Sequence, residues 1–268
     1  LITLSGQGQI KGRALKLDWR EPVTQVGGGP CTEGTIWVDT DSPLRQALAG
    51  GLSFVDGSMP VNMVYKDCGK GVEILNISGD LTPTRLNLRA LGYEKPSGKS
   101  GKISMDVTVR QNPSAIEARH VTITAPDVKM REGALDFAKA KDGTVNLVKA
   151  TLVDYKFGNS TGALIYQRHS DRIALDVAGT AFDLGPFLSG DADQPLGIPM
   201  SVKMRVDRLG FGGNSVLENA NLNVNLDRGS DLDRMDITGR AGAGNVMVKY
   251  MPDASGRMNL NVNAEDAG

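Results

Sequence analysis

Polar and apolar residues alternate with a period of two along most of this 268-residue chain. Residues 15–19, 103–110 and 202–207 each carry an apolar side chain at every second position. Successive side chains of a β-strand point to opposite faces of the sheet, whereas a helix would spread the same apolar residues around its axis. The alternation therefore predicts strands with one apolar and one polar face.

Turn sequences separate the alternating segments. The chain contains 33 Gly and 12 Pro, and examples are GGGP at 27–30, KPSG at 95–98 and DG at 142–143. Asp-Gly suits a two-residue hairpin turn because both residues adopt positive φ readily. The pattern predicts roughly 14–16 strands. It also predicts a short helix over 42–49, where Ser42 caps the first turn and Pro43 follows, and single helical turns over 183–188 and from 264.

So few helices leave the apolar faces of the strands to be covered by other strands. The sheet must then pack on itself as a sandwich, close as a barrel or curl into a trough. A trough would leave part of its apolar lining accessible, and exposed apolar surface of that extent marks a ligand or partner site. We expect residues 1–268 to form one β-rich segment, with a possible sub-boundary near 92–101.

The charge balance argues against nucleic acid as a partner. Lys and Arg total 30 and Asp and Glu total 31, which gives a net charge of −1, whereas a nucleic-acid-binding face leaves a basic excess. Nothing in the chain matches a serine-hydrolase elbow or a zinc-protease motif. We interpret His120 and His169 as a strand-surface and a turn residue rather than as a catalytic base or a metal ligand. We therefore expect no enzymatic activity, no cofactor and no bound metal.

The ends of the chain and its two cysteines bear on its context. No run reaches the roughly 18 apolar residues of a membrane span, and no signal segment is visible. We expect the chain to be a piece of a longer protein. Cys31 and Cys68 both lie beside turn residues. A disulfide in an oxidising compartment and two unpaired thiols are both compatible with this placement.

Four segments resemble a known family: 12–21 (GRALKLDWRE), 77–81 (ISGDL), 175–188 (LDVAGTAFDLGPFL) and 263–268 (NAEDAG). They are similar to strands of the AsmA-like proteins of the Gram-negative envelope, with the YhdP-type branch nearest and TamB-type proteins more distant. The resemblance is diffuse and spans most of the chain.

The resemblance implies a periplasmic body that belongs to a protein anchored in the inner membrane. The fold it implies is mainly β: an elongated, curled antiparallel sheet shaped like a trough, with one or two short helices. The function it implies is an apolar groove that carries phospholipid, or another lipid with acyl chains, between the inner and outer membranes. A periplasmic setting would also permit the disulfide. A structural alternative is a closed β-sandwich that serves as an envelope scaffold without a lipid ligand.

The residues expected to line such a groove are the apolar positions of the alternating strands. They are Leu15, Leu17, Ile103, Met105, Val107, Val109, Ile173, Leu175, Val177, Val202, Met204, Val206, Leu222, Val224, Leu226, Val246 and Val248.

Overall fold

The structure is a computed structural model that describes residues 1–23, 30–41, 55–88, 93–111, 114–139, 145–185, 197–213 and 215–265. All elements of this described part are strands. Their bounds are β1 Ile2–Ile10, β2 Arg13–Glu21, β3 Thr32–Thr40, β4 Val55–Asp56, β5 Met59–Asp67, β6 Val72–Asp80, β7 Arg85–Leu88, β8 Tyr93–Lys95, β9 Lys102–Arg110, β10 Ala115–Ala125, β11 Val128–Lys139, β12 Val145–Phe157, β13 Ser160–Arg168, β14 Ile173–Asp183, β15 Met200–Gly210, β16 Val216–Leu226, β17 Leu232–Ala241, β18 Gly244–Pro252 and β19 Met258–Ala264.

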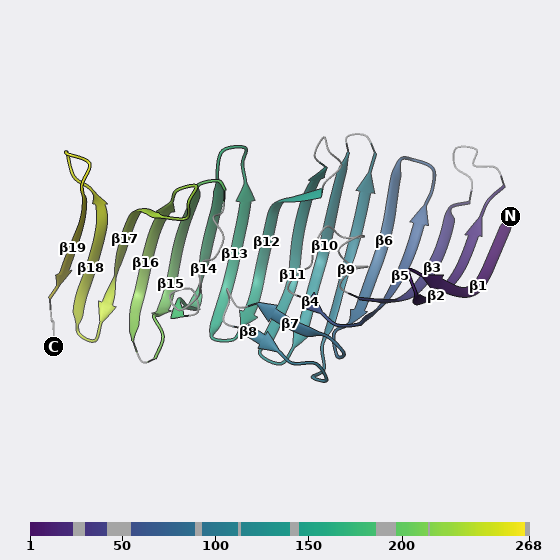
Figure 1. Ribbon diagram of the computed structural model, residues 1–268, viewed down its shortest axis with the longest axis horizontal. Coiled ribbons are helices and arrows are strands. Elements are labelled where there is room, and N and C mark those ends of the chain that lie inside the picture. The colour runs from purple at the N-terminus through teal and green to yellow at the C-terminus, as the bar shows by residue number, and fades with distance from the viewer. Residues whose placement is uncertain are drawn as a thin grey trace. The chain divides into compact units, whose positions relative to one another are not determined.

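Sixteen of the described strands form one mixed sheet, in the order β1-β2-β3-β5-β6-β9-β10-β11-β12-β13-β14-β15-β16-β17-β18-β19 (Figure 1). Strands β1 and β19 stand at opposite ends of this order, so the sheet is not closed into a barrel. The mainly-β prediction is confirmed. The remaining strands, β4, β7 and β8, form a separate three-stranded sheet.

Two details of the predicted fold differ from the structure. The sheet is not wholly antiparallel, because β14 and β15 pair in parallel. Alternation does not distinguish the two arrangements; the connection between the strands does. The expected short helices are not seen in the described residues: 42–49, 186–188 and 266–268 lie outside them, and Phe182 and Asp183 end strand β14.

The chain divides into two compact units. Unit 1 contains Leu1–Leu88 and Tyr93–Leu147, and unit 2 contains Arg89–Gly92 and Val148–Gly268. Residues 93–101 of the expected sub-boundary belong to unit 1. Each unit is described by itself below.

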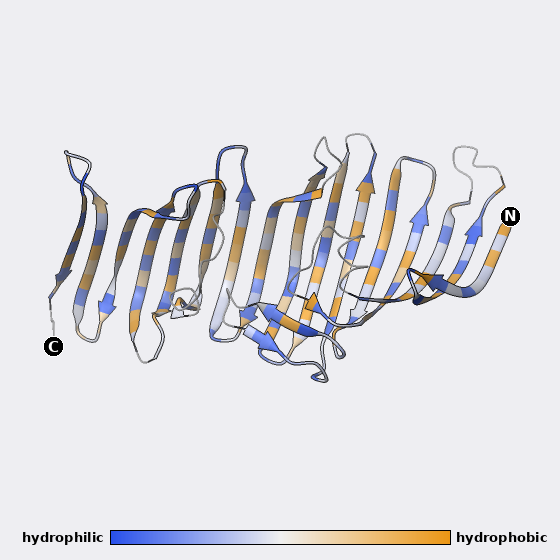
Figure 2. Ribbon diagram, viewed as in Figure 1, coloured by the Kyte–Doolittle hydropathy of each residue, from blue (hydrophilic) through white to orange (hydrophobic). Residues whose placement is uncertain are grey.

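In unit 1 the register places apolar residues of neighbouring strands opposite one another, and hydropathy alternates along the strands (Figure 2). Residues directly opposite each other project from the same face of a sheet. One row across five strands contains Leu15, Val38, Val61, Gly79 and Ile103. This face is called the apolar surface of unit 1, and the other its polar face.

Two stacked aromatic rings form one part of this apolar surface. The rings of Trp19 and Tyr65 stack with centroids 5.2 Å apart. Gly34 lies between them in the register, and a Cβ there would stand 2.3 Å from the Trp19 ring. Glycine at position 34 is therefore required for the indole to lie across β3.

The small sheet of β4, β7 and β8 covers one end of the apolar surface of unit 1. Its buried residues include Leu86 and Lys95. A Cβ built on Gly101, just before β9, would stand 3.4 Å from Lys95 Cε and 3.0 Å from the Leu81 side chain, so both side chains cover this glycine. Lys95 Nζ donates to the carbonyl oxygen of Thr84 at 2.7 Å, and burial lowers the pKa of this ammonium group. The lysine stem thus acts as apolar packing while its charge is held by a backbone acceptor.

In unit 2 the register also places apolar residues of neighbouring strands opposite one another, and more of them are buried. Val177, Met204, Leu222 and Ile237 stand opposite one another on successive strands, and all are buried. The face that carries them is called the apolar surface of unit 2. Leu209 is fully buried in the same cluster.

Candidate apolar binding surface

The predicted lining residues all lie on strands of the main sheet, and none is classed as exposed. Those that are buried belong to unit 2 and are Ile173, Val177, Met204, Val206 and Leu222. The others are half-buried, so part of each side chain remains accessible to solvent.

In unit 1 the register joins the predicted residues into one surface. Leu17 and Met105 belong to a single row whose intervening members are Ile36, Met63 and Ile77. These three were missing from the predicted lining, although 74–81 also alternates. Single-strand alternation identifies a face but not which other strands share it, and the register supplies that information.

In unit 2 a second row runs through the parallel pair. It contains Leu175, Val202, Val224, Met235 and Tyr250. Met235 and Tyr250 were also absent from the predicted lining. In the parallel pairing of β14 and β15, apolar residues stand opposite apolar residues. The apolar surface of unit 2 therefore continues across these two strands.

The end strands of the sheet carry several exposed apolar side chains. Leu4 on β1 is 56% exposed, and Leu260 and Val262 on β19 are 62% and 60% exposed. Each lies on the apolar surface of its own unit, because Leu4 stands opposite Trp19 and Val262 opposite Val248. An end strand has a neighbour on one side only, which leaves its side chains less covered.

Two hollows in the described residues open on the polar faces. In unit 1 a hollow of about 410 Å³ lies over the cross-strand row of Trp37, Asn62, Ser78, Ser104 and Thr122. In unit 2 a hollow of about 320 Å³ is lined mainly by polar-face residues of β14, β15 and β16. Most residues that line these hollows lie outside the predicted lipid-contacting set, with which the hollows share Ile103, Val177 and Met204.

The two histidines are placed in different units. His120 Nδ1 lies 2.9 Å from Asp106 Oδ2 on the polar face of unit 1, and both side chains are exposed. The hydrogen bond with His120, and then that from Asn76, lowers the pKa of Asp106. His120 has a φ of 51° where the β9–β10 register shifts, so a bulge aims its ring at Asp106. His169 lies in the turn before β14, and its backbone N–H donates to Arg172.

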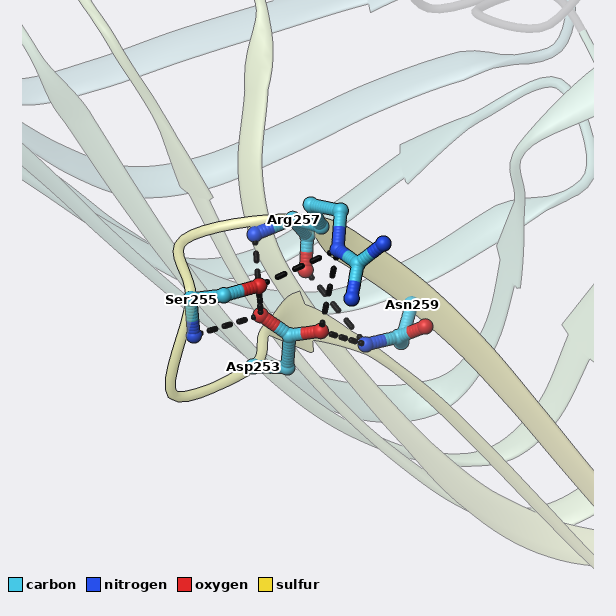
Figure 3. Close-up of polar contacts among 4 residues, drawn as sticks. All are labelled: Asp253, Ser255, Arg257 and Asn259. Atoms are coloured by element: carbon cyan, nitrogen blue, oxygen red, sulfur yellow. Dashed lines mark hydrogen bonds and ion pairs between the residues drawn. The ribbon is translucent and has the colours of Figure 1, made fainter.

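A network of polar contacts closes the hairpin between β18 and β19 (Figure 3). Asp253 Oδ1 accepts hydrogen bonds from the Ser255 hydroxyl at 2.6 Å and from the Arg257 backbone N–H at 3.0 Å. Its Oδ2 accepts one from Asn259 Nδ2 at 3.1 Å. These bonds, led by that of the Ser255 side chain, lower the pKa of Asp253 to about 2. Polar contacts therefore hold the tip of this hairpin together.

Cys31 and Cys68 are joined by a disulfide in the structure. They flank the pair formed by Thr32 and Asp67, so the bond ties the start of β3 to the end of β5. No group of three His, Cys, Asp or Glu side chains in the described part of the chain is arranged to hold a metal ion. Over the same residues, no helix has the length and apolar character needed to span a membrane.

Comparison with known proteins finds no matching family model, no similar curated protein and no similar solved structure.

Proposed function

We propose that the apolar surfaces of the two units bind the acyl chains of phospholipid, within a periplasmic segment of an AsmA-like protein that carries lipid between the inner and outer membranes. The observation that supports this proposal most directly is the cross-strand continuity of apolar residues in each unit. In unit 1 the row of Leu17, Ile36, Met63, Ile77 and Met105 consists of partly accessible apolar residues on five neighbouring strands.

The energetics favour an acyl chain as the ligand. Each methylene removed from water gains about 0.8 kcal/mol, so ten buried methylenes contribute about 8 kcal/mol. Aliphatic side chains such as Val107 and Leu175 form no directional bonds with a hydrocarbon, and a chain can therefore slide along them. Aromatic residues make up only 5% of the sequence, which agrees with a smooth aliphatic surface.

A structural scaffold is the second candidate function, and the interior of unit 2 favours it. Val206 and Ala220 are 2% and 1% exposed, and Leu209 is fully buried. Side chains so deeply covered contribute to stability rather than to a ligand surface. Under this alternative the half-buried positions of both units would also stay free of lipid.

Photo-crosslinking to a phospholipid with a diazirine in its acyl chain tests the proposal. Charged substitutions Val107→Asp in unit 1 and Leu175→Glu in unit 2 place a carboxylate on the apolar surfaces, and we expect them together to abolish crosslinking. Controls on the polar face are Thr108→Asp and Asp176→Glu, which should crosslink like the unsubstituted chain. Circular dichroism verifies that each variant folds. Undiminished crosslinking in a folded Val107→Asp/Leu175→Glu chain would refute the proposal.

A further inference from the structure

Trp37 of β3 carries a large aromatic ring on the polar face of unit 1. It stands opposite Lys16 of β2 and Asn62 of β5, and it is 40% exposed. The other tryptophan of the chain, Trp19, is stacked on Tyr65 on the apolar surface of the same unit. An indole combines a broad apolar face with one N–H donor, which suits a contact surface that is partly wet. The ring of Trp37 is thus available to a ligand, whereas that of Trp19 is used in packing.

The side chains that follow Trp37 across the sheet leave a hollow beside it. Asn62 is followed in the same row by Ser78 of β6, Ser104 of β9 and Thr122 of β10. These side chains are much shorter than an indole, so the surface dips beside the ring, and the hollow there has a volume of about 410 Å³. Sites for small molecules have volumes of roughly 300–1,000 Å³. The hollow is therefore large enough for a small ligand that leans against the indole.

The polar groups of the hollow are free to bind a ligand. Within the part of the chain that the structure describes, the side chains of Asn62, Ser78 and Ser104 form no hydrogen bond with protein, and all three residues are exposed. An amide and two hydroxyl groups can each both donate and accept hydrogen bonds. A ligand rich in hydroxyl groups could exchange hydrogen bonds with all of them.

The charges at the side of the hollow cancel. Asp80 of β6 and Lys102 of β9 stand opposite each other, and both line the hollow. With one negative and one positive group in the lining, a phosphate or another anion gains no net attraction from it. The lining therefore favours an uncharged ligand.

A sugar ring has the chemistry that these features require. Its faces carry C–H groups that pack against the electron-rich face of an aromatic ring, its edge carries hydroxyl groups, and it has no charge. We propose that the hollow beside Trp37 binds a neutral glycan, with one sugar ring stacked on the indole and its hydroxyl groups bonded to the amide and hydroxyl side chains of the row. The site lies on the opposite face of the sheet from the apolar surface of unit 1 and does not depend on lipid binding.

The two tryptophans provide an NMR test with an internal reference. A proton–nitrogen correlation spectrum of the full chain contains two indole N–H signals, one from Trp19 and one from Trp37. Neutral tetrasaccharides of glucose, mannose, galactose and N-acetylglucosamine are titrated separately. We expect at least one of them to shift the Trp37 signal to saturation and to leave the Trp19 signal in place. A Trp37 signal that no tetrasaccharide shifts, or equal shifts of both signals, would overturn the proposal.

Variants of the hollow identify the contact, with binding followed by saturation-transfer NMR of the sugar. We expect Trp37→Ala to weaken binding about tenfold or more, since truncated tryptophans are the costliest in binding sites, whereas Trp37→Tyr keeps a ring and should lose less. Ser104→Phe fills the floor of the hollow and should abolish binding. Ile74→Ala is the matched control, because Ile74 is 41% exposed on the polar face of β6 outside the hollow.

Circular dichroism verifies that each variant folds. Unchanged binding in a folded Trp37→Ala or Ser104→Phe chain, or loss of binding in Ile74→Ala, would contradict a site beside Trp37. Tighter binding of an acidic tetrasaccharide, tetragalacturonate, would overturn the assignment to a neutral ligand.

Discussion

Replacing Leu222 with alanine tests whether the apolar surface of unit 2 is a packed interior. Leu222 is 4% exposed and stands between Met204 and Ile237 in the cross-strand row. The substitution removes three carbons, which corresponds to about 2.4 kcal/mol of transfer free energy. The cavity left behind adds to this cost, so we expect the free energy of unfolding to fall by about 3–4 kcal/mol.

Urea denaturation followed by circular dichroism measures this loss. Leu260→Ala is the matched control, because Leu260 lies on the same surface but is 62% exposed. About one third of its side chain is covered, so the control should lose less than about 1 kcal/mol. Equal losses in the two variants would refute the assignment of Leu222 to a closed interior.

Three further predictions concern other parts of the chain. The hydrogen bonds to Asp253 lower its pKa from 3.8 to about 2. The stabilisation of the β18–β19 hairpin by the Asp253 carboxylate should therefore be full above pH 3.8 and be lost as the pH falls through 2. An NMR titration of this carboxyl group with a midpoint near 3.8 would contradict the prediction. Replacing both Cys31 and Cys68 with serine removes a disulfide that joins residues 37 positions apart in the sequence. We expect the free energy of unfolding of unit 1, measured by urea denaturation, to fall by about 4 kcal/mol. An unchanged midpoint of the urea transition would contradict a stabilising role of the disulfide. Gly179→Ala should destabilise unit 2 markedly in thermal denaturation, because the new Cβ would lie 2.2 Å from the Thr161 carbonyl oxygen. An unchanged midpoint of the thermal transition would contradict this close approach of β13 and β14.

Alternation predicted individual strands well. The alternating segment 103–110 corresponds to β9, Lys102–Arg110, and 202–207 lies inside β15. Each of these strands has the period-two pattern that the sheet requires, because one face meets apolar neighbours and the other meets water. The predicted 14–16 strands are fewer than the nineteen strands of the described residues, sixteen in the main sheet and three in the small one.

Features that depend on contacts between distant segments could not be predicted. Strands β4, β7 and β8 contain 2, 4 and 3 residues, and runs of this length have no measurable period. The pairing of His120 with Asp106 depends on a bulge in β10, which leaves no local sequence pattern. The partners of Leu17 and Met105 across the sheet follow from the register alone.

Native mass spectrometry of the chain after gentle purification from a phospholipid-containing envelope extract tests the central claim most directly. We predict bound phospholipid that is retained in the unsubstituted chain and absent from the folded Val107→Asp/Leu175→Glu variant. A folded, unsubstituted chain that carries no lipid, even when phospholipid is supplied in excess, would contradict the account and favour a scaffold.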